Sequence, residues 1–123
     1  MRAGIGSITA VAPKRGSPDI AWVVLIVAGL LEIVWAFAMK QSEGFSKPGW
    51  SAVTIVAMIA SFALLSVSMK TLPLGTAYTI WTGIGAVGAF VVGVALLGEP
   101  ATPMRVTAAV VIVGGLVAMK LSG

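Results

Sequence analysis

The sequence predicts an all-α integral membrane protein with four transmembrane helices. Of its 123 residues, 59% are hydrophobic and only 10% are charged, whereas about 25% of the residues of an ordinary soluble domain are charged. A chain this short cannot hide so many apolar side chains inside itself, so its composition favours lipid. Four long apolar runs, separated by short polar segments that contain proline, glycine or charge, are the second observation.

The first two predicted helices cover residues 20–39 and 50–69. Each run has 20 residues, and at a rise of about 1.5 Å per residue such a helix crosses the roughly 30 Å of bilayer hydrocarbon. Trp22 and Trp50 lie near the ends of these runs, where interfacial anchors are common. The segment 40–49 between them carries both signs of charge, glycine and proline, and is therefore predicted to be a loop.

The third and fourth predicted helices cover residues 76–97 and 106–119. A short connection, 70–75, leads into the third helix, and short connections make neighbouring helices antiparallel. The last run has only 14 residues, or about 21 Å as a helix. Arg105 and Lys120 flank it and extend its effective span by reaching outward to the headgroups.

The first 18 residues differ from the rest of the chain. They are rich in glycine, alanine, serine and proline and lack the apolar stretch of a signal peptide. We expect residues 1–18 to be a disordered tail or a non-native extension, and residues 19–123 to form the membrane domain.

Composition excludes several classes of function. Without cysteine or histidine, the chain has no disulfide and no thiolate or imidazole ligand for a metal or haem, so we expect no metal and no cofactor. The eight basic residues are scattered singly, which argues against nucleic-acid binding. An isolated intramembrane acid also offers too few groups for most hydrolytic mechanisms, so an enzyme is not expected.

Glu32 is the only charged residue within the four runs. It lies roughly 18 Å along the first helix, close to the bilayer midplane, where an ionised carboxylate is costly unless it is protonated or meets a cation. Competition between a proton and a cation for this carboxylate would give proton-coupled antiport. The alternative is a neutral Glu32 that joins helices by hydrogen bonds. Ser61, near the midplane of the second helix, is either a hydrogen-bond partner of Glu32 or a small packing residue.

Aromatic residues accompany the acid. Helical spacing puts Gly29 and Trp35 on the face of Glu32, and puts Tyr78 and Trp81 together on one face of the third helix. Aromatic walls beside a carboxylate favour a cation site. Taken singly, Trp35 and Trp81 fit an interfacial belt or a packing role equally well.

Glycines are unusually frequent in the last two helices. Those of the third helix serve either close helix approach or a hinge, and those of the fourth indicate a packing or dimer face; they are Gly83, Gly85 and Gly88, then Gly114 and Gly115. The first three form a GxGxxG string, but they lie inside an apolar run and not between a strand and a helix, so a dinucleotide site is rejected.

Three segments resemble the small multidrug resistance transporters, in particular their guanidinium-exporter branch. They read GLLEIVWAFAMKQSEGFS, ALLSVSMKTLPLGTAYTIWTGIGAVGAF and LLGEPATPMR, and the likeness extends from residue 20 to the C-terminus. The resemblance implies four helices per subunit, assembled as an antiparallel, dual-topology homodimer in the bacterial inner membrane, with the fourth helices forming much of the dimer contact.

The resemblance also implies roles for the residues discussed above. Glu32 would bind the proton and the substrate; Ser61, Tyr78 and Trp81 would hold it in a hydrogen-bond network; Trp35 and Gly29 would line the pocket. The expected partners are protons, a small guanidinium-like cation, membrane lipid and a second copy of the chain. A broader exporter of quaternary ammonium cations and a non-transporting assembly subunit are the alternatives.

Charge counting agrees with insertion in both orientations. Lys70 and Lys120 lie on one predicted side of the membrane, and Lys40, Lys47 and Arg105 on the other. Because these numbers are nearly equal, the positive-inside rule favours neither orientation of the chain in the membrane. The basic residues of the first 18 positions would favour a cytoplasmic N-terminus.

Overall fold

The computed structural model describes residues 18–122, which form four helices: α2 (Pro18–Gln41), α3 (Pro48–Ser68), α4 (Leu74–Leu97) and α5 (Pro103–Ser122). All four are long and apolar enough to cross a membrane, which confirms the prediction of four spanning helices. The tail predicted over 1–18 lies, apart from Pro18, outside the described residues.

The helices begin earlier than their apolar runs because proline starts them. Pro48 and Pro103 occupy the first turns of α3 and α5, where a missing backbone N–H costs nothing and the fixed φ suits the helix. As a result α5 has 20 residues, and not the 14 of its apolar run, and it spans about 30 Å without help from its flanking charges.

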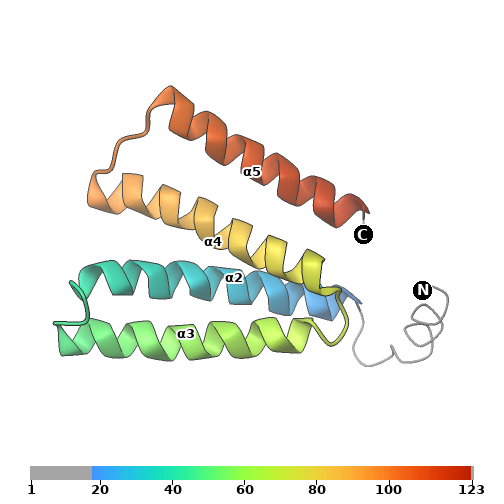
Figure 1. Ribbon diagram of the computed structural model, residues 1–123, viewed down its shortest axis with the longest axis horizontal. Helices are drawn as coiled ribbons and strands as arrows, with labels where there is room; N and C mark the ends of the chain where they lie inside the picture. Colours follow the sequence, from blue (N-terminus) through green and yellow to red (C-terminus); the bar gives the residue numbers. More distant parts are fainter. Residues whose placement is uncertain (1–17, 123) are drawn as a thin grey trace.

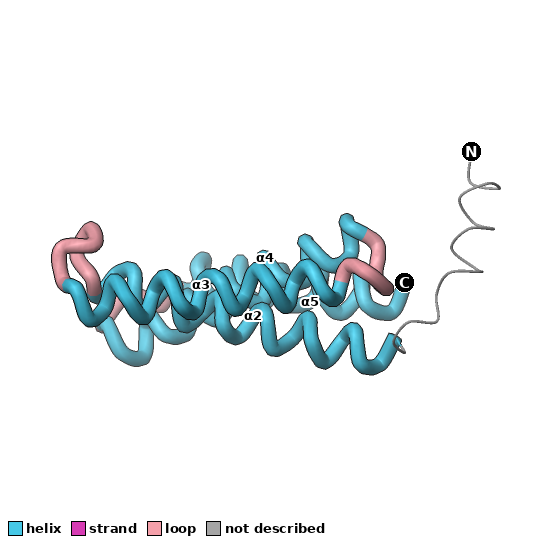
Figure 2. Tube along the Cα trace, turned by 90° about the horizontal axis from the view of Figure 1, so that it is seen from below, coloured by secondary structure: helices cyan, strands magenta, loops and turns pink. Residues whose placement is uncertain are grey.

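The helices lie side by side in the order α3, α2, α4, α5 (Figure 1). Their long axes run in similar directions, with the loops gathered at the two ends (Figure 2). α2 packs against both α3 and α4, whereas α5 packs mainly against α4, with Lys120 also lying over the ring of Trp22 on α2. The α2–α3 and α4–α5 loops share one end of the bundle, and the α3–α4 loop lies at the other (Figure 1).

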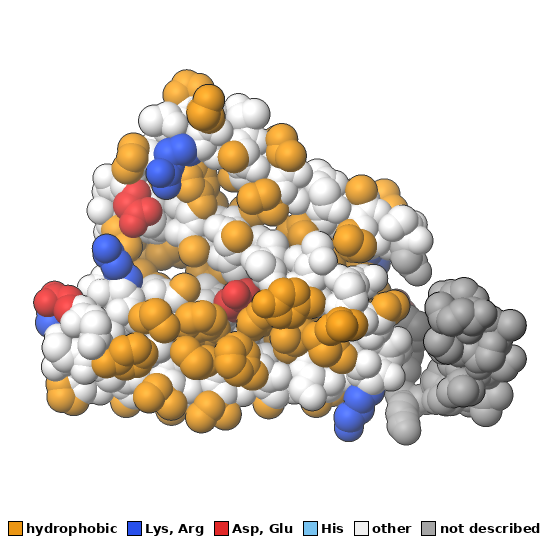
Figure 3. Space-filling model, viewed as in Figure 1, with side chains coloured by type: hydrophobic (Ala, Val, Ile, Leu, Met, Phe, Trp, Pro, Cys, Tyr) orange, Lys and Arg blue, Asp and Glu red, His pale blue; other side chains and the backbone are white. Residues whose placement is uncertain are grey.

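The buried core is small and lies where α2, α3 and α4 meet. Its members are mostly small or aliphatic, and they are Ala21, Leu25, Ala28, Leu65, Leu72, Ala77, Ile80 and Trp81. Large apolar side chains cover much of the outside, and charged ones lie mainly near the helix ends (Figure 3). No residue of α5 is buried over its described length. Exposed apolar surface of this kind is suited to lipid or to another membrane helix.

A glycine turns the chain out of α4. Gly98 adopts a left-handed conformation with φ 70°, a geometry that glycine takes without a steric penalty. The next backbone N–H, that of Glu99, donates to the carbonyl of Gly93 at 3.0 Å. The Glu99 carboxyl group is thereby folded back against Gly93, where a side chain would collide with it.

Candidate functional site

Glu32 lies midway along α2 and faces α4. Its carboxyl group rests on Gly85, and a Cβ at that position would collide with Glu32 Oε1. This oxygen is buried and accepts no hydrogen bond from any described residue. Because buried polar atoms are nearly always paired, this unpaired oxygen makes Glu32 the first candidate for a functional residue.

Ser61 is fully buried between three helices. Its hydroxyl donates to the carbonyl of Ala28 at 2.7 Å and accepts from Trp81 Nε1 at 2.9 Å. The expected hydrogen bond between Ser61 and Glu32 is not formed in this structure. The Ala28 carbonyl lies one helical turn before Glu32, so the serine links α4 and α3 to the turn of α2 that precedes the acid.

Four aromatic side chains form a continuous row across α2, α3 and α4. Ring centroids are 6.4 Å apart for Trp35 and Phe62, 5.6 Å for Phe62 and Trp81, and 5.5 Å for Trp81 and Tyr78. The first two contacts are edge-to-face, a favourable arrangement of aromatic quadrupoles. Trp81 is buried and Tyr78 is half exposed. Tyr78 therefore joins the site through ring packing on Trp81 in this structure.

Phe62 is the member of this row that the sequence did not reveal. It follows Ser61 on α3 and bridges the indoles of α2 and α4. Its position at mid-length in an apolar run was available from the sequence, but a phenylalanine there is most often a lipid-facing or packing residue. Only the rotation of α3 about its axis brings the ring to the site.

A second buried polar atom in this region has no partner. Trp35 Nε1 donates to no described residue, and Trp35 follows Glu32 by three positions on α2, so the two side chains leave the helix on the same side. α2 thus presents one acceptor and one donor one turn apart, and neither makes a hydrogen bond within the described part of the subunit.

Contacts with a neighbouring helix account for four of the six glycines named in the sequence analysis, Gly85 among them. A Cβ at Gly29 would meet Ile84, one at Gly83 would meet Leu116, and one at Gly88 would meet Ile33. The space beside Gly29 is therefore occupied by Ile84 of α4 in this subunit, and Gly29 does not line an open pocket. Gly114 and Gly115 differ, since nothing lies within 4 Å of a Cβ at either position.

The chemistry available at this site is the binding of a cation. Glu32 supplies a carboxylate, the aromatic row supplies ring faces, and Trp35 supplies a donor. Within residues 18–122, no cluster of three or more His, Cys, Asp or Glu side chains is arranged to hold a metal. A carboxylate with aromatic rings nearby is suited to an organic cation or a proton.

Comparison with known proteins supports the same assignment. Residues 20–113 match the family described as Small Multidrug Resistance protein. Curated proteins named "Guanidinium exporter" are similar over 102 residues, which are 83% of this chain and 97% of theirs; they come from Escherichia coli (strain K12), at 54% identity, and Salmonella typhimurium (strain LT2), at 56%. With its four apolar helices, the chain is a multi-pass protein of the bacterial inner membrane and belongs to the small multidrug resistance family.

Proposed function

We propose that the chain exports guanidinium and small guanidinyl cations across the inner membrane in exchange for protons. The observation that carries this proposal is the buried, unpaired Oε1 of Glu32 at the middle of a spanning helix. A proton removes the charge of this carboxyl group, and a hydrogen-bonding cation supplies the donors that it lacks. Because the same group takes one or the other, binding of the proton releases the cation, and binding of the cation releases the proton.

Guanidinium suits the geometry around Glu32. It is planar and presents a fork of N–H donors that matches a carboxylate, and its flat face stacks on aromatic rings. Trp35, one turn after Glu32, begins a row of such rings that continues through Phe62 and Trp81. The proteins from Escherichia coli and Salmonella typhimurium that are named guanidinium exporters support this choice of substrate.

We further propose that two copies assemble as an antiparallel homodimer and share the site through their Glu32 carboxylates. Support comes from α5, which has no buried residue and leaves Gly114 and Gly115 open for close approach of another helix. Opposite insertion of the two copies is supported by the balance of basic residues, with Lys70 and Lys120 near one end of the bundle and Lys40, Lys47 and Arg105 near the other.

The test is guanidinium flux in proteoliposomes under an imposed proton gradient. We expect gradient-driven flux from the unmodified chain and none from Glu32→Gln, which keeps the shape of the side chain but cannot bind a proton in exchange. Glu43→Gln is the matched control, because Glu43 lies in an exposed loop and pairs with Lys47. Flux that survives in Glu32→Gln would contradict competition at this carboxylate.

Substrate range is decided by comparing guanidinium with tetramethylammonium in the same assay. Tetramethylammonium has no N–H donors, so it relies on aromatic faces alone. Transport of tetramethylammonium without guanidinium would assign the chain to the broader exporter of quaternary ammonium cations. Transport of neither cation would favour the non-transporting assembly subunit.

A further inference from the structure

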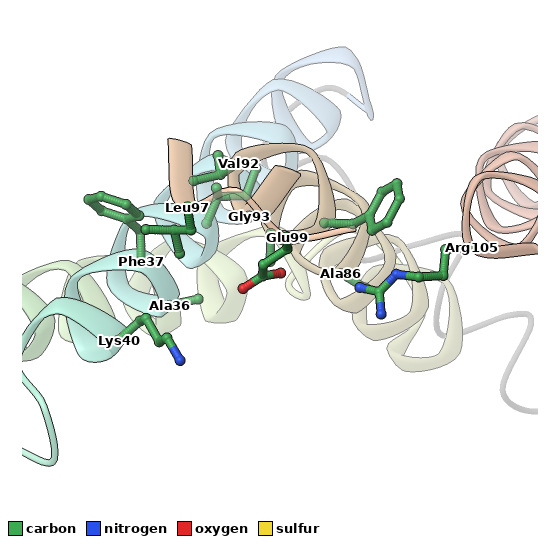
Figure 4. A pocket seen from close by; sticks show the side chains of 12 residues that line it. Ala36, Phe37, Lys40, Ala86, Val92, Gly93, Leu97, Glu99 and Arg105 are labelled. Carbon is green, nitrogen blue, oxygen red and sulfur yellow. The ribbon is translucent and has the colours of Figure 1, made fainter. Parts of the chain in front are cut away.

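A cavity of about 290 Å³ opens between α2, α4 and the start of α5, toward the end of the bundle that has the α2–α3 and α4–α5 loops. Its volume is near the lower limit of small-molecule pockets, roughly 300 Å³. Three charged side chains from three different elements border it: Lys40 in the last turn of α2, Glu99 just after α4, and Arg105 in the first turn of α5. In Figure 4, Lys40 and Arg105 stand on either side of Glu99.

Two of these charged side chains contact neutral neighbours, and no ion pair joins the three within the described part of the chain. The Arg105 guanidinium lies over the ring of Phe90, 5.5 Å from its centroid, and the Glu99 carboxyl group rests on Gly93. In the described part of the chain, the ion pair at this end joins Glu43 and Lys47 at 3.0 Å, outside the cavity. Lys40, Glu99 and Arg105 thus surround one space as separate charges.

The charged rim of the cavity lies near the ends of the spanning helices, and its walls extend inward to Ile33 and Ala86, next to Glu32 and Gly85. The spanning segments end at Gln41 and Leu97, and the next begins at Pro103, so all three charged residues are within a few positions of the edge of the hydrocarbon region. The rest of the lining is largely apolar and includes Phe37, Val92 and Leu97. Two cations and a carboxylate at the rim, above apolar walls, form an amphipathic cavity.

We propose that this cavity binds a phospholipid whose headgroup carries both a phosphate diester and a primary ammonium group, the chemistry of phosphatidylethanolamine. Lys40 and Arg105 hold the phosphate, Glu99 accepts from the ammonium group, and the apolar walls contact the start of an acyl chain. Phosphate is recognised by paired cationic donors, with arginine giving the directed contact. With this headgroup each charged side chain faces a group of opposite charge, because the ammonium group is opposite Glu99.

Other ligands match these three charges less well. An anionic phospholipid with an uncharged headgroup offers no cationic group to the Glu99 carboxylate. A guanidinium ion meets two like charges, Lys40 and Arg105. Phosphatidylcholine carries the right charges, but its quaternary ammonium has no N–H to donate to the Glu99 carboxylate.

The experiment is native mass spectrometry of the intact chain in detergent, titrated separately with dioleoyl phosphatidylethanolamine, dioleoyl phosphatidylcholine and dioleoyl phosphatidylglycerol. We expect tightest retention of phosphatidylethanolamine. Equal retention of the three lipids, or tighter retention of phosphatidylglycerol, would overturn the proposal. This series uses the unmodified chain, so it does not depend on the folding of any variant.

Two variants test recognition of the ammonium group and of the phosphate separately. Glu99→Gln is expected to lose the preference for phosphatidylethanolamine over phosphatidylcholine, an effect of about fivefold for one ion pair near water. Lys40→Met combined with Arg105→Met is expected to lose retention of both lipids. Glu43→Gln combined with Lys47→Met is the matched control, since it removes one acid and one base from the same end outside the cavity. An equal loss in this control would overturn the assignment.

Competition distinguishes a lipid site from a free-phosphate site. Soluble phosphoethanolamine is expected to displace bound phosphatidylethanolamine at lower concentration than inorganic phosphate does, because it also occupies Glu99. Equal displacement by the two compounds would show that the cavity recognises only the anion and would overturn the role of Glu99.

Discussion

The carboxyl group of Glu32 on α2 rests directly on Gly85 of α4, in the space that a side chain at position 85 would fill. The position of the Glu32 carboxyl group thus depends on the absence of a side chain at position 85. Any side chain at position 85 must displace the carboxyl group or separate α2 from α4.

Gly85→Ala is expected to disturb the proposed cation site. The added methyl group moves the Glu32 carboxyl group, so guanidinium binding, measured by titration calorimetry in detergent, should weaken at least tenfold. Gly75→Ala is the matched control, because it also lies in α4 but nothing stands within 4 Å of its Cβ position. Unchanged binding in Gly85→Ala would mean that the carboxyl group is not held by this contact.

Ser61→Ala should destabilise the subunit by about 1–3 kcal/mol, because it leaves the buried Trp81 Nε1 without its acceptor. The measurement is equilibrium unfolding in mixed micelles. Ser51→Ala provides the comparison, since the Ser51 hydroxyl bonds only to Lys47 O one turn earlier and is exposed. Adding Trp81→Phe, which removes the donor as well, should cost less than the sum of the single changes. Additive losses would contradict a direct Ser61–Trp81 hydrogen bond.

Gly83→Ala should loosen the contact between α4 and α5, since its Cβ would collide with Leu116. Overpacking of this kind costs about 1–3 kcal/mol. Leu116→Ala removes the colliding atoms, so the double variant should be more stable than the two single losses predict. Equilibrium unfolding in mixed micelles measures the stability of the three variants. Strictly additive losses would contradict a direct contact between position 83 and Leu116.

Phe62→Leu should weaken guanidinium binding by about two- to fivefold, the value of a cation–π contact at a partly exposed site. Phe62→Tyr keeps the ring and should bind like the unmodified chain. Titration calorimetry compares the three proteins. Equal binding by all three would exclude the ring of Phe62 from the site.

Gly114→Val and Gly115→Val should lower the dimer fraction while leaving the subunit folded, because each position is open within the subunit. Single-molecule photobleaching in bilayers, with the protein diluted in lipid, measures the fraction directly. Gly49→Val, at a position in α3 that is equally open, should keep the dimer fraction of the unmodified chain. A normal dimer fraction in the α5 variants would place the proposed interface elsewhere.

The sequence by itself determined the number of spanning helices and the depth of Glu32. Both depend on consecutive residues, since hydrophobicity over about 20 positions marks a membrane helix and a fixed rise per residue converts position into depth. Helix ends were less well predicted: the run 106–119 becomes α5 over Pro103–Ser122, because Pro103 starts the helix before the apolar residues do.

Only the tertiary structure decided which side chains meet. Ser61 bonds to Ala28 and Trp81 and not to Glu32, Phe62 completes the aromatic row, and Lys40, Glu99 and Arg105, which in the sequence are separate loop charges, border one cavity. Contacts between helices depend on the rotation and spacing of each helix against its neighbours. Those quantities follow from packing of side chains far apart in the chain, so no local pattern of residues encodes them.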